Sequence, residues 1–512
     1  MTWSCSASGH ARRAEHEALR VLERREEEVL GAREATVRQP TLLPEPSEPT
    51  NAEESAAEPA PREALVLGLR QALALAYQSS RQMLDRRESL EREALSLLDV
   101  RHGFAPQLAL ALSYLLDDPA GNPDSNFGDV GFSFSQILPT GARLALEASS
   151  TVQAAEGQSG TYGSFVSLSL AQPLLRGGGY AVTHEPLIQA ERSLVYALRE
   201  FELFREDFSI DVARRFYDLV NRKQSIDNQR RNLENNEFGR RQAEAFFAVG
   251  RTSELDVLRA RRSELTARNA QLEAQESLLL ELDNFRIFLG LPEDQPVDVE
   301  PASPLFTPVR YDARSAVEVA LENRLDLCNR REQLEDVERG LRLARNALLP
   351  DLELALGTSY ATDPVDRLGG EDLERSDSTL SVTLGLPLDR VRQRNAYRSA
   401  ELSLSRSRRE LEEFVDQLRV RIQSSFRELE RRLQSLEIQR QLILDQTKNL
   451  RIAELRFERG ELPNRDVVEA NQSLLDAENA LIDEQVSYEI ARLQLLRDLG
   501  ILFVGDDGMW KQ

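Results

Sequence analysis

The sequence predicts an α+β fold built from two copies of one pattern, in which long helices alternate with short groups of strands. Long stretches rich in Leu, Ala, Glu, Arg and Gln are typical of long helices and coiled coils. Short segments with an apolar residue at every second position are typical of strands with one apolar face. The segments 246–260 and 455–470 share a glycine, an Asp-Val pair and an alanine at positions that differ by 210, which indicates an internal two-fold repeat.

Composition excludes several classes of function. The chain has 512 residues, 29% of them charged, and a formal net charge of -22, which disfavours nucleic-acid binding because phosphate contact needs basic patches. The two cysteines, Cys5 and Cys328, are too few for a disulfide framework or a zinc site. The four histidines are scattered, and no nucleophile–base constellation is present, so we expect no metal, no cofactor and no enzyme activity.

The first 62 residues differ from the rest. Residues 11–38 are charged and helix-prone, and residues 40–62 form a spacer rich in Pro and Glu. No apolar signal core precedes Cys5. If translation begins at Met1, nothing obvious exports the chain; if the true start lies upstream, Cys5 could be the lipid-bearing first residue of a mature lipoprotein. The alternative is a stray N-terminal cysteine.

Alternating segments predict four strands in the first copy and two in the second. They lie in residues 104–114, in two strands within 131–150, in 164–173, in 348–360 and in 378–387. The two strands within 131–150 are joined by a tight turn at Pro139–Gly141. This extra pair lies either in the same sheet as the others or in a projecting extracellular hairpin.

The predicted helices have matched lengths. The first copy has a long helix near 182–249 with short ones near 64–103 and 250–289; the second has a long helix near 393–459 with short ones near 315–349 and 465–500. In the first copy, short helices of about 38 and 32 residues together match a long helix of about 68 residues, and the second copy repeats this relation, as antiparallel stacking would require. Leucines at seven-residue spacing, from Leu258 to Leu279, support coiled packing.

The repeats divide the chain into five parts. We predict an N-terminal segment, a first repeat, a Pro-rich linker that forms a belt around the helices, a second repeat and a short C-terminal tail, with the bounds 1–62, 63–290, 291–314, 315–502 and 503–512.

A few strands per copy cannot close a barrel in one chain, yet an open sheet edge in lipid leaves backbone groups unpaired. The strands must therefore be pooled among several chains. Small residues on one face, such as Ser167 and Ser169, suit a water-filled interior, and the leucines on the other face suit lipid. The predicted fold class is thus a shared membrane β-barrel continued by a long antiparallel α-helical coiled-coil barrel.

Several motifs together resemble the TolC-type outer-membrane efflux family over about residues 63–502. They are Pro-x-Leu-x-Leu-x-Leu after each short helix, QPLLRGGG at 172–179, the doubled Gly-x5-Asp-Val-x2-Ala, and the segments 285–291 and 495–501. The resemblance implies a homotrimer whose barrel lies in outer-membrane lipid and whose helical tunnel crosses the periplasm. It further implies passive conduction from an inner-membrane RND, ABC or MFS transporter, through a periplasmic membrane-fusion (adaptor) protein, in efflux or type I secretion. Some members carry a lipid on the N-terminal cysteine, which favours that role for Cys5.

The resemblance also assigns residues. Gly250 and Gly460 lie at the two helix-hairpin tips, where a left-handed turn suits glycine. Asp466 and Glu469, three apart on one helix face, are expected to form a ring of carboxylates at the periplasmic mouth. Asp256 either joins this constriction or only favours the start of its helix.

Other tip residues are candidates for adaptor contact: Phe457, Leu462, Val257 and Val467. Leu462 stands where one branch of the family has an arginine that latches the mouth, and Phe457 stands where that branch has a tyrosine. Both differences argue against a charged latch of that kind.

Two other functions compete with this one. A soluble coiled-coil scaffold protein would explain the acidity and the missing leader, but it leaves the alternating strands at matching points of both repeats unexplained. A hydrolase has no supporting site. The cargo cannot be read from the sequence, because the pump would select it.

Overall fold

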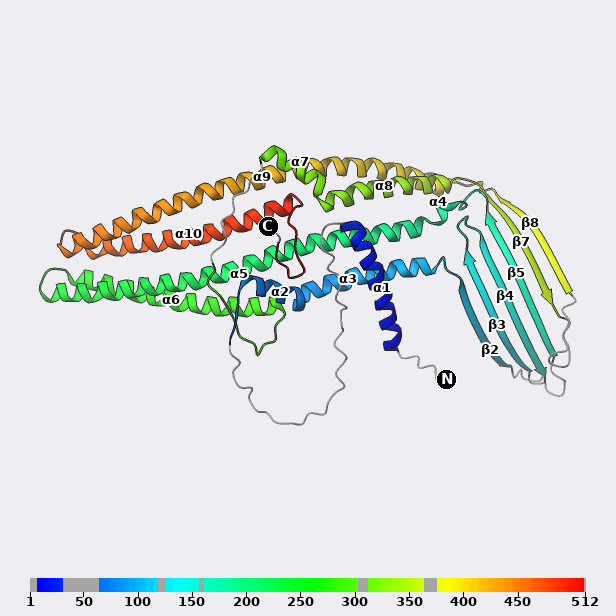
Figure 1. The fold of residues 1–512 in the computed structure, drawn as a ribbon, viewed down its shortest axis with the longest axis horizontal. Helices are drawn as coiled ribbons and strands as arrows, with labels where there is room; N and C mark the ends of the chain where they lie inside the picture. Colours follow the sequence, from blue (N-terminus) through cyan, green and yellow to red (C-terminus); the bar gives the residue numbers. More distant parts are fainter. Residues whose placement is uncertain are drawn as a thin grey trace. The chain divides into compact units, whose positions relative to one another are not determined.

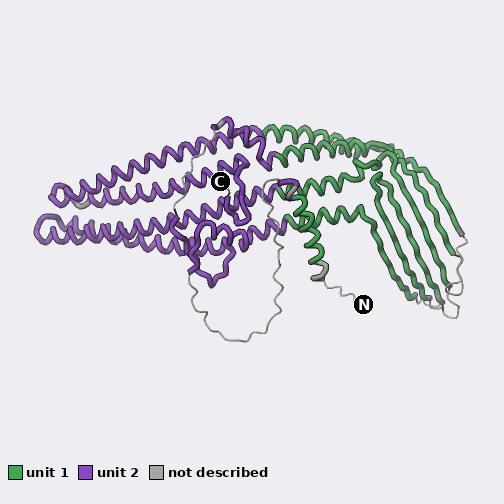
Figure 2. The backbone as a smooth tube through the Cα atoms, viewed as in Figure 1, with its two compact units in different colours: residues 1–25, 90–198, 328–413 green, residues 26–89, 199–327, 414–512 purple. Residues whose placement is uncertain are grey.

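The computed structural model describes residues 7–30, 64–117, 125–155, 161–302, 312–362 and 375–510. The chain divides into two compact units (Figure 2), one of residues 1–25, 90–198 and 328–413, the other of residues 26–89, 199–327 and 414–512. Cys5 and the predicted spacer 40–62 lie outside the described residues.

The first unit contains a six-stranded sheet (Figure 1) whose order is β2-β3-β4-β5-β7-β8. Its strands are β2 (Gln107–Asp117), β3 (Ser125–Ile137), β4 (Arg143–Ala155), β5 (Thr161–Pro173), β7 (Asp351–Ala361) and β8 (Arg375–Gly385). Every neighbouring pair is antiparallel. Four strands come from the first repeat and two from the second, as predicted, and the extra pair β3–β4 is part of the sheet.

Register places most apolar residues of the six strands on one face, whereas Leu115, Phe127 and Phe165 lie on the other. Leu108 pairs with Phe134, and Leu146 pairs with Leu168, so these side chains share a face. The opposite face carries small and polar residues such as Ser135. Because leucines on the edge strands β2 and β8 are 55–74% exposed, this apolar face is largely uncovered in one chain.

Ten helices lie in the described ranges. They are α1 (Ala7–Leu30), α2 (Leu69–Ser79), α3 (Arg81–His102), α4 (Tyr180–Thr183), α5 (Glu185–Ala248), α6 (Glu254–Leu289), α7 (Ala313–Asn323), α8 (Leu325–Asn346), α9 (Val391–Glu458) and α10 (Asn464–Asp498). Within these ranges no helix is long and apolar enough to cross a membrane.

The short helices pack antiparallel beside the long ones, as their lengths predicted. Along α5, Arg222 binds Ser277 of α6 at 2.7 Å and Arg240 binds Glu264, so the numbers rise on one helix as they fall on the other. On the second repeat, Arg432 of α9 binds Glu484 of α10 at 3.1 Å. Each of these contacts lies within one unit.

The two short helices before the sheet were predicted as continuous, and this was wrong. The first breaks between α2 and α3 at Ser80, the second between α7 and α8 at Arg324, where the backbone is extended with ψ 129° and 121°. Glycines in left-handed conformation, Gly290 and Gly500, end α6 and α10 beside these two breaks.

The breaks satisfy the helix ends that meet them. Ser79 donates its Oγ hydrogen to the Leu289 carbonyl at 2.7 Å, and Arg324 donates to the Asp498 carbonyl at 3.2 Å. These carbonyls belong to the last turns of α6 and α10, which have no partner inside their own helix. The breaks therefore depend on contacts with the ends of α6 and α10. Hydrophobic periodicity reports only the local helix and carries no information about a facing helix end, so it predicted neither break.

The predicted belt and tail contain additional structure. Within the linker 291–314, β6 (Val297–Val299) pairs in parallel with β1 (Leu65–Leu67). At the C-terminus, the Arg205 guanidinium, 1% exposed, donates to the carbonyls of Val504 and Gly505 at 3.0 Å each. The tail is therefore fixed to α5 in the second unit.

Substitution of the two helix-ending glycines should be costly. A Cβ at Gly290 would lie 1.9 Å from the Ser79 carbonyl oxygen, and one at Gly500 would lie 2.8 Å from that of Asn323. We expect Gly290→Ala and Gly500→Ala each to lower the free energy of unfolding by roughly 2–5 kcal/mol, from backbone strain and overlap. Thermal unfolding of the purified protein measures this.

The control is Gly340→Ala within α8, where a Cβ meets nothing within 4 Å. Alanine is favoured over glycine by about 0.5–1 kcal/mol in a helix, so this variant should unfold at the same or a higher temperature. A Gly500→Ala protein with the wild-type midpoint would contradict the packing described.

Candidate functional site

The α5–α6 and α9–α10 hairpins of the second unit end in the same turn. Gly250 has φ +73° and Gly460 has φ +76°. The Gly250 N–H donates to the Phe247 carbonyl at 2.9 Å, and the Arg251 N–H donates to that of Phe246 at 2.8 Å. Gly460 and the residue after it repeat both bonds, to the carbonyls of Phe457 and Arg456. This pair of bonds is the Schellman motif, which ends helices on a left-handed residue.

The next helices begin differently. At the start of α6, Ser253 accepts a hydrogen bond from the Asp256 N–H, and the Asp256 carboxylate accepts from the hydroxyls of Ser253 and Thr252 at 2.6 and 3.1 Å. This reciprocal arrangement is a capping box. At the start of α10, Pro463 is the capping residue and provides no side-chain hydrogen bond. Asp256 therefore has a structural role that Asp466 lacks.

The cap lowers the pKa of Asp256. The first cause is the hydrogen bond from Ser253, with further contributions from Thr252 and from Arg259 at 3.5 Å. A lowered pKa in the folded state stabilises the protein at pH values above the unfolded pKa, and this contribution is lost as the pH falls through the folded pKa.

Asp466 and Glu469 lie in the first turns of α10 on one helix face. The Asp466 side chain is half-exposed, and no residue whose side chain the structure describes pairs with its carboxylate. The Glu469 side chain is 69% exposed and lies 3.9 Å from Arg465. Carboxylates that solvent reaches attract cations, so this pair, one half-exposed and one exposed, has the chemistry that the predicted ring requires.

The tips of the two hairpins contact each other through aromatic rings. Phe246 of α5 and Phe457 of α9 have ring centroids 5.6 Å apart, and the Arg251 guanidinium lies 5.2 Å from the Phe246 ring. Phe457 is 6% exposed, and Leu462 is half-buried. The tips are thus joined by an aromatic contact. Such ring pairs are worth about 0.5–1.5 kcal/mol beyond the area they bury.

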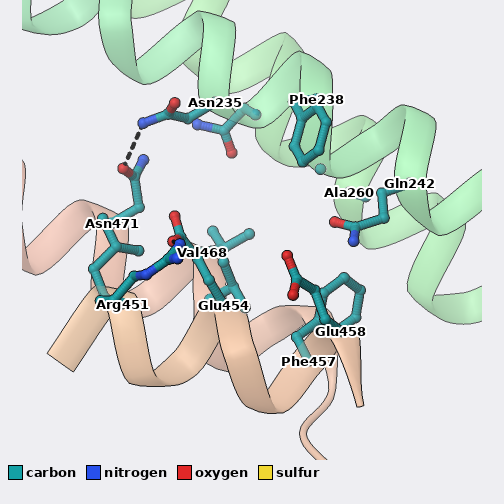
Figure 3. Close-up of a pocket in the computed structure, with 14 residues that line it drawn as sticks. Asn235, Phe238, Gln242, Ala260, Arg451, Glu454, Phe457, Glu458, Val468 and Asn471 are labelled. Atoms are coloured by element: carbon teal, nitrogen blue, oxygen red, sulfur yellow. Dashed lines mark hydrogen bonds and ion pairs between the residues drawn. The ribbon is translucent and has the colours of Figure 1, made fainter. Parts of the chain in front are cut away.

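Beside this contact lies a cavity of about 240 Å³ between α5, α6, α9 and α10 (Figure 3). Phe457 and Glu458 line one end and Phe238 lines the α5 side. Val467 lines it as well, whereas Val257 does not. The cavity thus lies between the two hairpins, next to the ring contact that joins their tips.

From the cavity wall toward the N-terminal end of α5, hydrogen bonds between asparagines join α5 to α10. Asn228 donates to Asn479 at 2.7 Å, and Asn471 donates to Asn232 at 2.6 Å. Asn235 donates to Asn471 at 3.0 Å, the bond drawn in Figure 3. Asn228 and Asn232 are 3% and 7% exposed, so a polar seam replaces leucine packing between these helices.

Sequence reasoning missed Phe246 and this asparagine seam. The sequence has no signal for Phe246, because the matching position of the second repeat is Arg456 and a ring contact between two hairpins has no sequence period. The asparagines recur on α5 at 228, 232, 235 and 236, a helical spacing that could have identified them as one face.

Comparison with known proteins identifies the family. The family model described as outer membrane efflux protein matches residues 100–291 and 316–500, one match in each repeat. These matches cover most of the chain. The chain belongs to the outer membrane efflux protein family. No protein of curated function was matched.

Solved structures of outer-membrane channels share the fold of this family member. The outer membrane protein VceC from Vibrio cholerae has 18% identity and a TM-score of 0.64 over 84% of this chain and 96% of its own. The outer-membrane channel OprN has 16% identity and a TM-score of 0.63 over 84% and 89%. The Campylobacter jejuni CmeC outer membrane channel has 16% identity and a TM-score of 0.62 over 85% and 86%.

The different caps predict different effects of the two aspartates on the tips. Asp256→Ala removes the carboxylate half of the capping box, whose hydrogen bonds from Ser253 and Thr252 are worth about 0.5–1.5 kcal/mol, so amides in the first turn of α6 should exchange with solvent roughly 2- to 13-fold faster. Asp466→Ala should leave the first turn of α10 nearly unchanged. Hydrogen exchange with mass spectrometry compares the two segments, and equal acceleration in both would contradict the capping assignment.

Proposed function

We propose that this chain is the outer-membrane channel of a tripartite efflux or type I secretion system. In this role it passively conducts substrates from an inner-membrane pump across the periplasm and the outer membrane. The observation that carries the proposal is the six-stranded sheet with one continuous apolar face and two free edges, β2 and β8.

The sheet edges explain the need for several copies. Backbone groups at an edge have no water to bind in lipid, so the sheet must close. Each chain contributes an even number of strands in alternating directions, so β8 of one copy would meet β2 of the next in antiparallel orientation. A homotrimer, which the family resemblance implies, would close a barrel in this way with its apolar face toward outer-membrane lipid.

The helices carry a second apolar surface that one chain leaves exposed. The α6 leucines at seven-residue spacing are each 56–58% exposed: Leu258, Leu265, Leu272 and Leu279. Such a seam is the contact surface of a coiled coil, and one chain leaves it uncovered. A helix from the neighbouring copy would cover it, which supports an α-helical tunnel formed by the trimer.

In this trimer Asp466 and Glu469 would form rings of carboxylates at the periplasmic mouth, and Asp256 would act mainly as a helix cap. The tips, with Gly250, Gly460, Leu462, Val257 and Val467, would meet a periplasmic adaptor protein. An RND, ABC or MFS transporter of the inner membrane would supply the driving force. Cys5, in a mature chain, would carry the lipid.

The assembly itself is the first test. The protein should purify in detergent as a trimer, appear as a long tube by electron microscopy and form channels in planar bilayers. A water-soluble monomer that forms no channels would overturn the proposal and favour a coiled-coil scaffold.

Removing the proposed ring should reduce cation selectivity. Asp466→Ala with Glu469→Ala takes two carboxylates from each copy at the mouth, and the permeability ratio of K⁺ to Cl⁻ should fall by roughly a factor of two or more. Reversal potentials in a salt gradient measure this ratio. The control, Glu276→Ala with Asp283→Ala on α6, removes the same charge away from the tips, and an equal effect of both variants would refute the ring.

Loss of the contact between the tips should open the channel more often. Phe457→Ala removes a ring contact worth about 0.5–1.5 kcal/mol, which predicts a roughly 2- to 10-fold higher ratio of open to closed channels. Phe238→Ala is the matched control, because Phe238 lines the same cavity but is 62% exposed. Single-channel recordings that show the same change for both variants would rule out a specific role for Phe457.

A further inference from the structure

The two repeats contribute unequally to the sheet. In the second repeat β7 and β8 pair directly with each other, from Asp351 opposite Gly385 to Ala361 opposite Arg375. In the first repeat two further strands, β3 and β4, lie between the corresponding strands β2 and β5 (Figure 1). Measured against the chain's own second half, β3–β4 is an inserted hairpin.

The hairpin is a full part of the sheet. β3 and β4 have 13 residues each and pair with each other along their whole lengths, from Ser125 opposite Ala155 to Ile137 opposite Arg143. β3 also pairs with all of β2, and β4 pairs with β5 over eleven positions. A projecting hairpin would not be hydrogen-bonded on both sides.

The hairpin also continues both faces of the sheet. Phe132, Phe134 and Leu146 extend the apolar face between the leucines of β2 and those of β5. Ser133 and Glu147, which pair with each other, extend the face of small and polar residues, and Glu147 pairs on with Ser167. The inserted strands are therefore built for the same boundary between lipid and water as their neighbours.

The turn of the hairpin is tied to the turn that follows β5. Thr140 donates its hydroxyl hydrogen to Gln172 at 2.7 Å and accepts the Gly179 N–H on its carbonyl at 2.9 Å. Gly141 has φ +90°, and a Cβ there would lie 2.7 Å from the Thr183 hydroxyl oxygen. The insertion thus has its own contacts with the end of the sheet where α4 begins.

Removing the hairpin would leave a sheet that still matches in register. Gln107 of β2 is level with Ser135, Ala145 and Ser169 across the sheet, and β2 is antiparallel to β5. Without β3 and β4, Gln107 could pair with Ser169, and each face would keep its residues. The insertion changes the number of strands and leaves the pattern of the rest intact.

We infer that the β3–β4 hairpin widens the outer-membrane pore, so that the barrel passes bulkier hydrated cargo than the same chain would pass without it. This inference rests on the proposed trimeric channel. Three copies with six strands each would close an 18-stranded barrel, and three copies with four strands would close one of 12. Since barrel diameter grows roughly linearly with strand number, the bore would be about 1.5 times as wide and about twice as large in cross-section.

The test compares the full chain with a variant that lacks residues 122–157, which joins β2 to β5. Both are reconstituted in planar bilayers, and polyethylene glycols of increasing size are added on the side of the barrel. Entry of polymer from that side reports the bore of the barrel even when the mouth at the other end is narrow. The size at which polymer stops entering should be larger for the full chain by about 1.5-fold in radius.

Outcomes for this inference and for the proposed function are separable. If both channels exclude polymer at the same size, the widening is wrong while the channel stands. If the full chain forms neither trimer nor channel, the proposed function is wrong. If only the deletion variant fails to form a trimer, its pore size cannot be compared. A second measurement, on the full-length chain, then tests the inference.

Adjacent residues of β3 provide that measurement. Ser133→Cys places a thiol on the polar face and Phe134→Cys places one on the apolar face, each in a chain with Cys328→Ser. A charged thiol reagent should modify the Ser133→Cys channel and lower its current, and should leave the Phe134→Cys channel unaffected. The parent chain controls for Cys5. Unchanged current after complete modification of Ser133→Cys would remove β3 from the pore wall and overturn the inference.

Discussion

The need to pair the backbone at the two edges of the sheet governs the rest of this structure. An antiparallel sheet with one apolar face and free edges is stable in lipid only when it closes, since each unpaired group there costs several kcal/mol. Six strands in one chain leave β2 and β8 as edges. In the proposed channel, association of copies is therefore a condition of folding in the membrane. The exposed leucines of α6 show that the helices, too, have an apolar surface that one chain leaves uncovered.

Within the second unit, the two repeats resemble each other most closely at the ends of their helices. Gly250 and Gly460 form the same turn, and Gly290 and Gly500 end the following helices in the same left-handed conformation. All four differ in pairs by 210 residues, although the intervening sequences differ. A helix face can exchange one apolar residue for another, whereas a left-handed position in tight contact admits little besides glycine, so the turns preserve the repeat better than the helices do.

The sequence predicted the elements well because their signals are local. Alternating apolar residues, with a tight turn at Pro139–Gly141, located the six strands, and matched helix lengths located the two long hairpins. The breaks at Ser80 and Arg324 were missed because each is stabilised by the end of a helix that lies about 175–210 residues away in the chain. The ring contact between Phe246 and Phe457 and the pairing of β1 with β6 were missed for the same reason. At the site, the turn glycines could be predicted from their motif, but the hydrogen bonds of Asp256 with Ser253 and Thr252 became known only from the structure.

The two repeats differ at the two places to which we assign a function, the start of the second helix of each hairpin and the sheet. Asp256 is held by its cap, and Asp466 at the matching position is free of side-chain partners in the part of the chain described. The first repeat places four strands in the sheet and the second places two. A duplicated chain has to keep its helix ends equal so that both halves pack, but a carboxylate at a tip or a hairpin in a sheet can change in one half alone without disturbing that packing. Departures from the repeat are therefore the better guide to what distinguishes this family member, and in the proposed channel one bears on the charge of the mouth and the other on the width of the pore.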